Sequence, residues 1–250
     1  VRCFKEGTGS KYGSYDSDFS IESATNLSLE GTANSYIVSE SGTYCFNAVK
    51  GNSSASLESV ASAEVLWESF GTTIPPYKGD LIVGARYSDG KVYFKTADSY
   101  QEGNALIVIR DDSGTILWSW HIWLTDLPVE QVYYNNAGTM MDRNLGAISA
   151  TPGDVGALGL FYQWGRKDPF LGLASTTSTI FANSTYNWPS NVEVSSIDSP
   201  VEYSIANPTT FISSWDYDGS LNGEEALWHS EKPVYDPCPA GWRVPNGGVD

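Results

Sequence analysis

The segment 115–124, which reads TILWSWHIWL, constrains the fold more than any other part of the sequence. The opposite faces of a strand receive alternate side chains, so Ser119, His121 and Trp123 share one face. A strand with two largely apolar faces must be covered on both sides. We therefore expect one face to lie in the core of a β-sandwich and the other to contact a second domain. The apolar residues of the first face are Ile116, Trp118, Trp120, Ile122 and Leu124.

Short strand-like runs separated by turn residues recur from residue 19 to residue 126, at the spacing of a β-sandwich. The connections 88–90 and 111–114 have the chemistry of hairpin turns, with glycines free to adopt positive φ. We expect a mostly β chain with an immunoglobulin-like or related β-sandwich over 19–126. The expected strands are 19–22, 34–38, 43–49, 64–68, 80–87, 91–96, 104–110 and 115–124.

The sequence changes character after Asp126. Residues 127–250 contain fewer regular runs, more prolines, and many Trp and Tyr in irregular context. Only two helices are expected, one over 155–165 and a short one over 224–230. A region rich in loops and aromatic residues with few helices is typical of a lectin-like α+β domain, rather than of a helical bundle or a doubly wound sheet.

A net charge of −16, from 30 acidic and 14 basic residues, bears on the partners of the chain. Nucleic acids and anionic membrane surfaces both attract clustered Lys and Arg, so we expect no nucleic-acid partner. No apolar run approaches the ~18 residues that a membrane-spanning helix needs, so no membrane span is expected here. The acidity suits solubility outside a cell and the binding of divalent cations.

Five stretches are specific enough to indicate a family: MDRNLGA (141–147), GLFYQWGRKDPF (159–170), NPTTFI (207–212), the pair Trp228-His229, and YDPCPAGWRVP (235–245). Together they resemble the Fibrobacter succinogenes major paralogous domain, a C-type-lectin-like family on surface proteins of Bacteroidetes-type bacteria. The upstream stretches 33–54, 63–72 and 103–126 look like the β module that precedes this domain. The resemblance implies an extracellular protein attached at the cell surface, with an incomplete lectin-like domain over 127–250.

The first residues, VRCFKE (1–6), resemble the closing strand of the same lectin-like family, and 7–18 look like a linker. This resemblance implies that both ends are cut points within a longer protein. Either the protein is a tandem array, or the strand completes a domain whose middle is absent. The resemblance makes Cys3 and Cys238 the disulfide-type positions. Cys45 departs from that scheme and is predicted to be a small buried hydrophobe.

Candidate ligand and metal sites lie in the second half of the chain. Trp188 and Trp215 are the candidates for stacking on a sugar, with ordinary packing as the alternative, whereas the resemblance places Trp164 and Trp242 in the core. Oxygen ligands at alternate positions around a Gly turn favour calcium, with a solvated acidic loop as the alternative. The candidate calcium ligands are Asp216, Asp218, Asn222 and Glu224.

No motif for catalysis or phosphate binding is present. His121 lies in a Trp-rich strand and is expected to be a hydrogen-bonded core residue, while His229 is expected to face solvent or cap a turn. The paired carboxylates Asp111 and Asp112 belong to a hairpin turn. The arginines of the family motifs, Arg143, Arg166 and Arg243, are expected to anchor loops through carboxylate or backbone contacts.

The function favoured by the sequence is non-enzymatic adhesion or ligand display, with a glycan or protein of another cell as the partner and the sandwich as a stalk. No cofactor other than calcium is expected. The alternative is a structural subunit of a pilus or filament, in which a terminal strand is donated to a neighbouring copy. A third reading is an enzyme of sulfatase-activating type, which shares the lectin-like fold but needs reactive cysteines or a metal.

Overall fold

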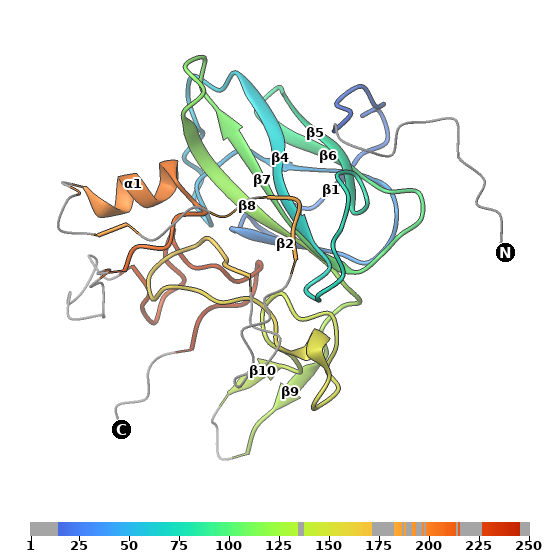
Figure 1. Ribbon diagram of the computed structural model, residues 1–250. Coiled ribbons are helices and arrows are strands. Elements are labelled where there is room, and N and C mark those ends of the chain that lie inside the picture. Colours follow the sequence, from blue (N-terminus) through green and yellow to red (C-terminus); the bar gives the residue numbers. More distant parts are fainter. Residues whose placement is uncertain are drawn as a thin grey trace, which may run out of the picture.

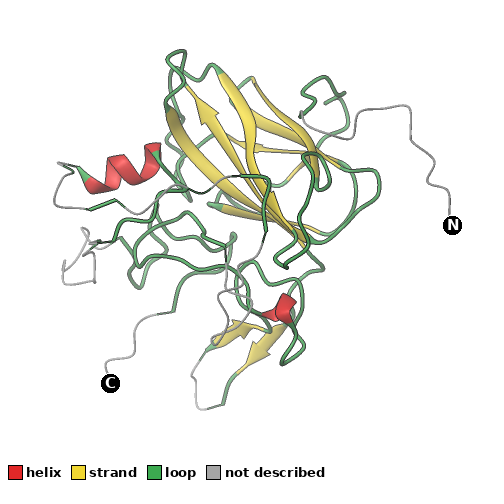
Figure 2. Cartoon of the chain, in the orientation of Figure 1, coloured by secondary structure: helices red, strands yellow, loops and turns green. Residues whose placement is uncertain are grey.

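Two four-stranded sheets dominate the computed structural model, in which residues 15–134, 138–171, 183–186, 188, 192–193, 197, 199–213, 215 and 227–245 are described. One sheet has the order β1 (Thr25–Asn26), β3 (Thr43–Asn47), β6 (Lys91–Thr96), β5 (Ile82–Ser88). The other has the order β2 (Ser35–Val38), β8 (Ile116–Leu124), β7 (Gly103–Arg110), β4 (Ser62–Ser69). The pairs β1–β3 and β2–β8 are parallel, and the others are antiparallel. The expectation of a mostly β chain is therefore confirmed (Figures 1 and 2).

One apolar core joins the inner faces of the two sheets. Phe46 of β3 lies 5.0 Å, between ring centroids, from Trp120 of β8, and 4.6 Å from Tyr36 of β2. Phe94 of β6 and Ile107 of β7 are fully buried in the same cluster. The sheets thus pack face to face through alternate side chains, as in a β-sandwich.

The described residues between 127 and 245 form a second part of the molecule, which we call the loop layer. Its regular elements are β9 (Glu130–Val132), β10 (Thr139–Met141), a 3₁₀ helix (Val155–Ala157) and α1 (Pro200–Ala206). Figure 1 shows it below and to the left of the sheet that contains β8. Trp67, Leu106 and Val108, which point out of the sandwich, form a smaller buried cluster with Leu160 of the layer. β8 is therefore covered on both faces, as its sequence predicts. No helix among the described residues is long and apolar enough to span a membrane.

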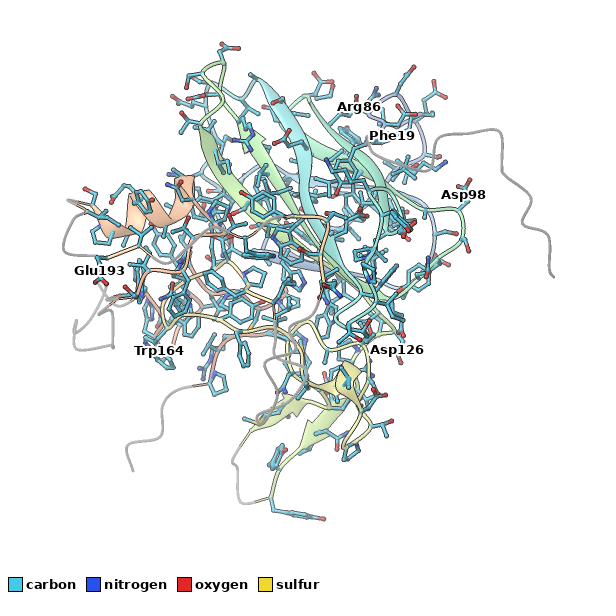
Figure 3. The ribbon with its side chains drawn as sticks, in the orientation of Figure 1. Phe19, Arg86, Asp98, Asp126, Trp164 and Glu193 are labelled. Carbon is cyan, nitrogen blue, oxygen red and sulfur yellow. The ribbon has the colours of Figure 1, made fainter. Side chains whose placement is uncertain are left out.

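The start of the chain differs from the sequence-based expectation. No strand forms over 19–22; instead, the edge strand is β1, and Phe19 lies beside the Arg86 guanidinium at 5.6 Å (Figure 3). Residues 15–18, assigned to the linker, are held against β5 by a 2.9 Å bond from the Asp16 N–H to the Val83 carbonyl. A Cβ on Gly84 would lie 1.7 Å from the Asp16 carbonyl oxygen, so only glycine permits this approach.

The predicted helix 155–165 is wrong, because only the three-residue 3₁₀ helix forms there. Gly159 has φ +71°, and a Cβ on it would lie 2.7 Å from the Leu145 carbonyl oxygen. Beyond it, Phe161 and Phe170 exchange two backbone hydrogen bonds of 2.9 and 2.7 Å, which turns the chain back on itself.

The second predicted helix, 224–230, is not helical in its described part, 227–230. There Trp228 Nε1 donates to the Tyr235 carbonyl at 2.9 Å, so the indole fixes a loop instead. Conversely, the sequence analysis missed α1, whose signal is a proline at its first position, where a missing N–H costs nothing.

Glu68 of β4 is a buried carboxylate within the sandwich. It accepts three backbone hydrogen bonds, from Gly79 at 2.8 Å, Leu81 at 2.9 Å and Ile82 at 2.6 Å. Burial, which outweighs these bonds, raises the pKa of the Glu68 carboxyl to about 7. The side chain thus fixes the turn that leads into β5.

Candidate functional site

A buried ionic group fastens the loop layer to β8. Asp168 Oδ1 accepts a hydrogen bond from Ser119 Oγ at 2.5 Å and from Lys167 Nζ at 2.7 Å. Lys167 Nζ also contacts the Ser119 hydroxyl and lies 4.5 Å from the centroid of the Trp118 ring. The side chains of Lys167 and Asp168 are only 2 and 3 % exposed. Burial lowers the pKa of Lys167, and the Asp168 charge opposes that shift. An ion pair this well enclosed is a structural clamp, because no solvent reaches it.

Arg166, next in the chain, ties the layer together internally. Its Nη1 donates to the Thr210 carbonyl and to Gln163 Oε1, both at 2.7 Å. The guanidinium also lies 5.0 Å from the Phe170 ring centroid and 5.5 Å from that of Trp215. Burial lowers the pKa of Arg166 to about 10, so the group remains cationic at neutral pH. The prediction that this arginine anchors loops is confirmed.

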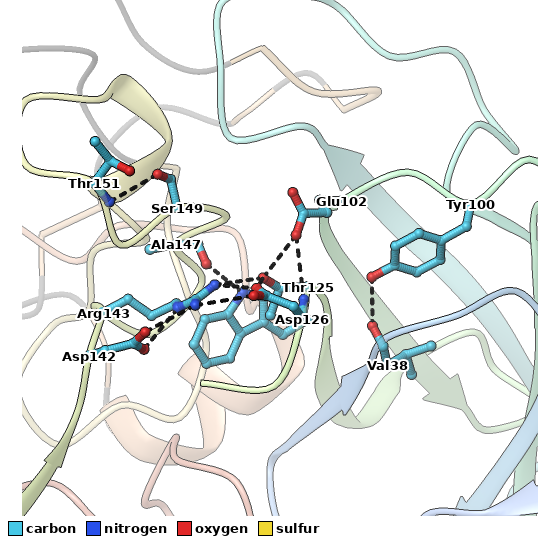
Figure 4. A network of polar contacts seen from close by, with 11 residues as sticks. Val38, Tyr100, Glu102, Thr125, Asp126, Asp142, Arg143, Ala147, Ser149 and Thr151 are labelled. Carbon is cyan, nitrogen blue, oxygen red and sulfur yellow. Dashed lines mark hydrogen bonds and ion pairs between the residues drawn. The ribbon is translucent and has the colours of Figure 1, made fainter. Parts of the chain in front are cut away.

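Arg143 joins the end of β8 to the segment after β10 (Figure 4). Its guanidinium donates to Asp126 Oδ1 at 2.5 Å and to Asp142 Oδ1 at 3.0 Å. These hydrogen bonds are the main reason why the pKa values of both carboxyls are lowered. Arg143 is thus an anchor, as predicted, while Arg243 is exposed and donates to the Val244 carbonyl at 3.0 Å.

The two histidines carry no catalytic arrangement. His121 is 1 % exposed; its Nε2 donates to Asn104 Oδ1 at 2.8 Å, so Nδ1 accepts from Ser35 Oγ at 3.1 Å. Burial lowers the pKa of His121 to about 3, so the ring is neutral at physiological pH. The Nδ1 atom of His229 accepts the N–H of Glu231 at 3.2 Å and caps a turn. Both predictions about the histidines are confirmed.

A cleft of about 1160 Å³ opens between the β9–β10 hairpin and the segment 237–245. Its lining includes Tyr133, Met141, Tyr162, Trp228 and Trp242, together with the Cys238 thiol. Burial raises the pKa of Cys238 to about 12, so the sulfur is a protonated thiol and a poor nucleophile. The Tyr162 hydroxyl is buried and has no hydrogen-bond partner among the described residues. The cleft therefore offers aromatic and apolar surface together with the charged residues Asp142, Arg143 and Arg243.

Asp236 shapes the wall of the cleft that carries Cys238. This carboxylate is 1 % exposed and accepts the N–H of Cys238 and that of Val244, both at 2.8 Å. Lys232 Nζ lies 2.7 Å from its Oδ1 atom. The Asn34 side-chain amide, on the sandwich, donates to the carbonyls of Val234 at 2.7 Å and Asp236 at 2.9 Å. The wall is thus held from both the layer and the sandwich.

The two tryptophans predicted to bind ligand do not line this cleft. Trp188 packs 5.8 Å from Trp67 and 6.0 Å from Phe170, between ring centroids. Trp215 donates from Nε1 to the Trp164 carbonyl at 2.8 Å. The cleft instead contains Trp228 and Trp242, whose signal in the sequence is the pair of motifs at 228–229 and 235–245.

Two tryptophans predicted to be core residues are not core residues. Trp164 is 41 % exposed and packs against Trp228 at 5.0 Å between centroids, because the loop that contains it turns toward the surface. Trp242 is half-buried and lines the cleft. The expectation for Cys45 is confirmed, as the thiol is buried in β3 and unpaired.

The remaining predicted site residues fall outside the described part of the chain. These are the four candidate calcium ligands, Asp216, Asp218, Asn222 and Glu224, and the disulfide-type Cys3. Among the described residues, no three His, Cys, Asp or Glu side chains are placed to hold a metal ion. Comparison with protein-family models, with curated proteins and with solved structures finds no match to this chain.

Proposed function

We propose that this chain is a non-enzymatic adhesion or ligand-display module of a cell-surface protein, in which the sandwich presents the cleft of the loop layer. The observation that carries the proposal is the cleft itself. Trp228, Trp242 and Tyr133 offer aromatic surface, and such surface in a concave site is typical of ligand binding. The ligand is a glycan or a protein of another cell.

The chemistry of the groups around the cleft supports binding over catalysis. A thiol with a pKa of about 12 is not an activated nucleophile, and the described histidines serve as packing and turn residues. The clamps at Asp168, Arg166 and Arg143 hold irregular loops on a rigid sheet. A scaffold that fixes loops without regular elements suits a binding surface, because loops tolerate sequence change while the sheet does not.

Two tryptophan variants test the proposal. The purified chain is assayed on a glycan array and on an array of extracellular proteins, first as wild type. We expect Trp242→Ala to weaken the binding of any ligand found on the arrays about 10-fold or more, because the variant removes an aromatic anchor of the cleft. Trp188→Ala is the matched control, since that indole is half-buried like Trp242 but lies outside the cleft. Equal loss in both variants, or no ligand on either array, would contradict the proposal.

A further inference from the structure

The free edge of β10 is the feature of the cleft that the proposed function does not use. In the antiparallel β9–β10 pair, the Tyr133 N–H bonds the Gly138 carbonyl and the Asp142 N–H bonds the Val129 carbonyl, both at 2.9 Å. Hydrogen-bonded and non-hydrogen-bonded pairs alternate along such a ladder. Thr139 and Met141 therefore belong to non-hydrogen-bonded pairs, and their N–H and C=O groups point away from β9.

The cleft runs along this edge. Every residue from 138 to 145 lines it, whereas β9 contributes none and only Tyr133, just beyond β9, joins them. A cleft over one face of the hairpin would be lined by alternate residues, so an unbroken run indicates the edge. Neither Thr139 nor Met141 makes a further hydrogen bond within the described part of the chain. A strip of unpaired backbone donors and acceptors thus borders a concave apolar surface.

We propose that the cleft binds an extended segment of a partner polypeptide, which adds to β10 as a third strand. This inference rests on the proposed function, because it assigns the chemical class of the ligand of the same cleft. Three features favour a strand over other ligands. Thr139 and Met141 offer two donors and two acceptors spaced for a β-ladder. A hairpin of two strands is marginal in isolation, and a third strand stabilises it.

The third feature is the chemistry of the side-chain subsites. Met141, Trp228 and Trp242 provide apolar contacts for alternate side chains of the added strand. The charged residues that line the cleft are Asp142, Arg143 and Arg243, so its lining has no excess of negative charge. The partner segment is therefore an extended one with apolar residues at alternate positions.

A pair of proline variants tests the strand geometry. Thr139→Pro removes an N–H on the cleft edge without removing any bond between β9 and β10. Val132→Pro is the matched control, because Val132 is the direct partner of Thr139 and its N–H points from the opposite edge of the hairpin. The probe is a phage library of random dodecapeptides, selected on the wild-type chain. We expect selected peptides to bind Thr139→Pro about 10-fold or more weakly and Val132→Pro with unchanged affinity.

N-methylated peptides keep the inference testable even if Thr139→Pro fails to fold. Methylation at alternate residues of a selected peptide abolishes pairing in one register, and methylation at the intervening residues leaves binding intact. Equal tolerance of both patterns, or no enriched peptide, overturns the strand proposal. Glycan binding that is lost in Trp242→Ala alone would then show that the display function stands while the strand proposal fails. If the wild-type chain dimerises and Thr139→Pro does not, the added strand comes from a second copy of the chain. This outcome overturns the proposal of a different partner polypeptide.

Discussion

The buried side chains at the centre of the sandwich are apolar, among them Phe46, Phe94 and Trp120, whereas the buried side chains of the loop layer include the charged Arg166, Lys167 and Asp168. The sheets can rely on apolar packing because their ladders already satisfy the backbone. The layer has few regular elements, so charged side chains must bond the carbonyls that its loops leave unpaired. The comparison teaches that irregular structure is held by specific polar contacts, and that the buried ones among them are costly to break.

The largest expected effect lies in the sandwich. Trp120→Ala empties the centre of the apolar core, and we expect it to lower the free energy of unfolding by about 4–5 kcal/mol. Urea unfolding followed by tryptophan fluorescence measures the change. Leu29→Ala, on a side chain that is 80 % exposed, serves as the control and should cost less than about 1 kcal/mol. A similar loss of stability in both variants would contradict the role of Trp120 as a central packing residue of the core.

Breaking the buried ion pair between Lys167 and Asp168 should lower the free energy of unfolding almost as much as Trp120→Ala does, but the effect should be confined to the loop layer. Asp168→Ala leaves the Lys167 ammonium buried without its counterion, which we expect to destabilise the protein by about 3–4 kcal/mol. Hydrogen exchange should then speed up for amides of the layer while the inner strands of the sandwich keep their protection. Asp112→Ala, in an exposed hairpin turn, is the control. Uniform loss of hydrogen-exchange protection in the sandwich and in the loop layer would show that the ion pair does not stabilise the layer in particular.

Glu68 sharpens the comparison, because it is a buried carboxyl clamp inside the sandwich. Its pKa is raised from 4.5 to about 7, so the folded protein binds this proton more tightly than the unfolded chain does. The resulting stability is fully present below about pH 4.5 and is lost as the pH rises through 7, which amounts to about 3 kcal/mol. Urea unfolding at pH 5 and pH 8 measures it. Glu68→Gln should remove this part of the pH dependence, and an unchanged slope would refute the assignment.

The smallest effect is expected at the exposed end of an anchor. Asp126 is 70 % exposed, so its bond to Arg143 is screened by water. We expect Asp126→Asn to change stability by about 0.5 kcal/mol, and less in high salt. Thermal unfolding with and without 1 M salt would measure the difference. A loss as large as that of Asp168→Ala would mean that exposure does not separate the two kinds of ion pair.

The sequence predicts the sandwich better than the layer for the same physical reason. Period-two alternation at β8 and β6 is a local signal, and the observed strands match the predicted ranges to within a residue. In contrast, the apolar residues around Phe161 imitate a helix face, while Gly159 and the distant Phe170 determine the loop. The aromatic residues of the cleft could be located only through their motifs. Nothing local in the sequence indicates that Ser119 meets Asp168, or that β10 borders the cleft.

The Asn34 side chain has a consequence for how the chain is made. This residue is 1 % exposed, and its amide oxygen accepts the Trp118 Nε1 proton at 3.0 Å. Its amide nitrogen donates to the carbonyls of Val234 and Asp236, up to 202 residues further on. While the chain is still growing on the ribosome, that donor has to remain hydrated. The hydrogen bonds between Asn34 and the carbonyls of Val234 and Asp236 can form only when that segment has emerged. This corner of the sandwich is therefore among the last parts of the protein to reach its native contacts.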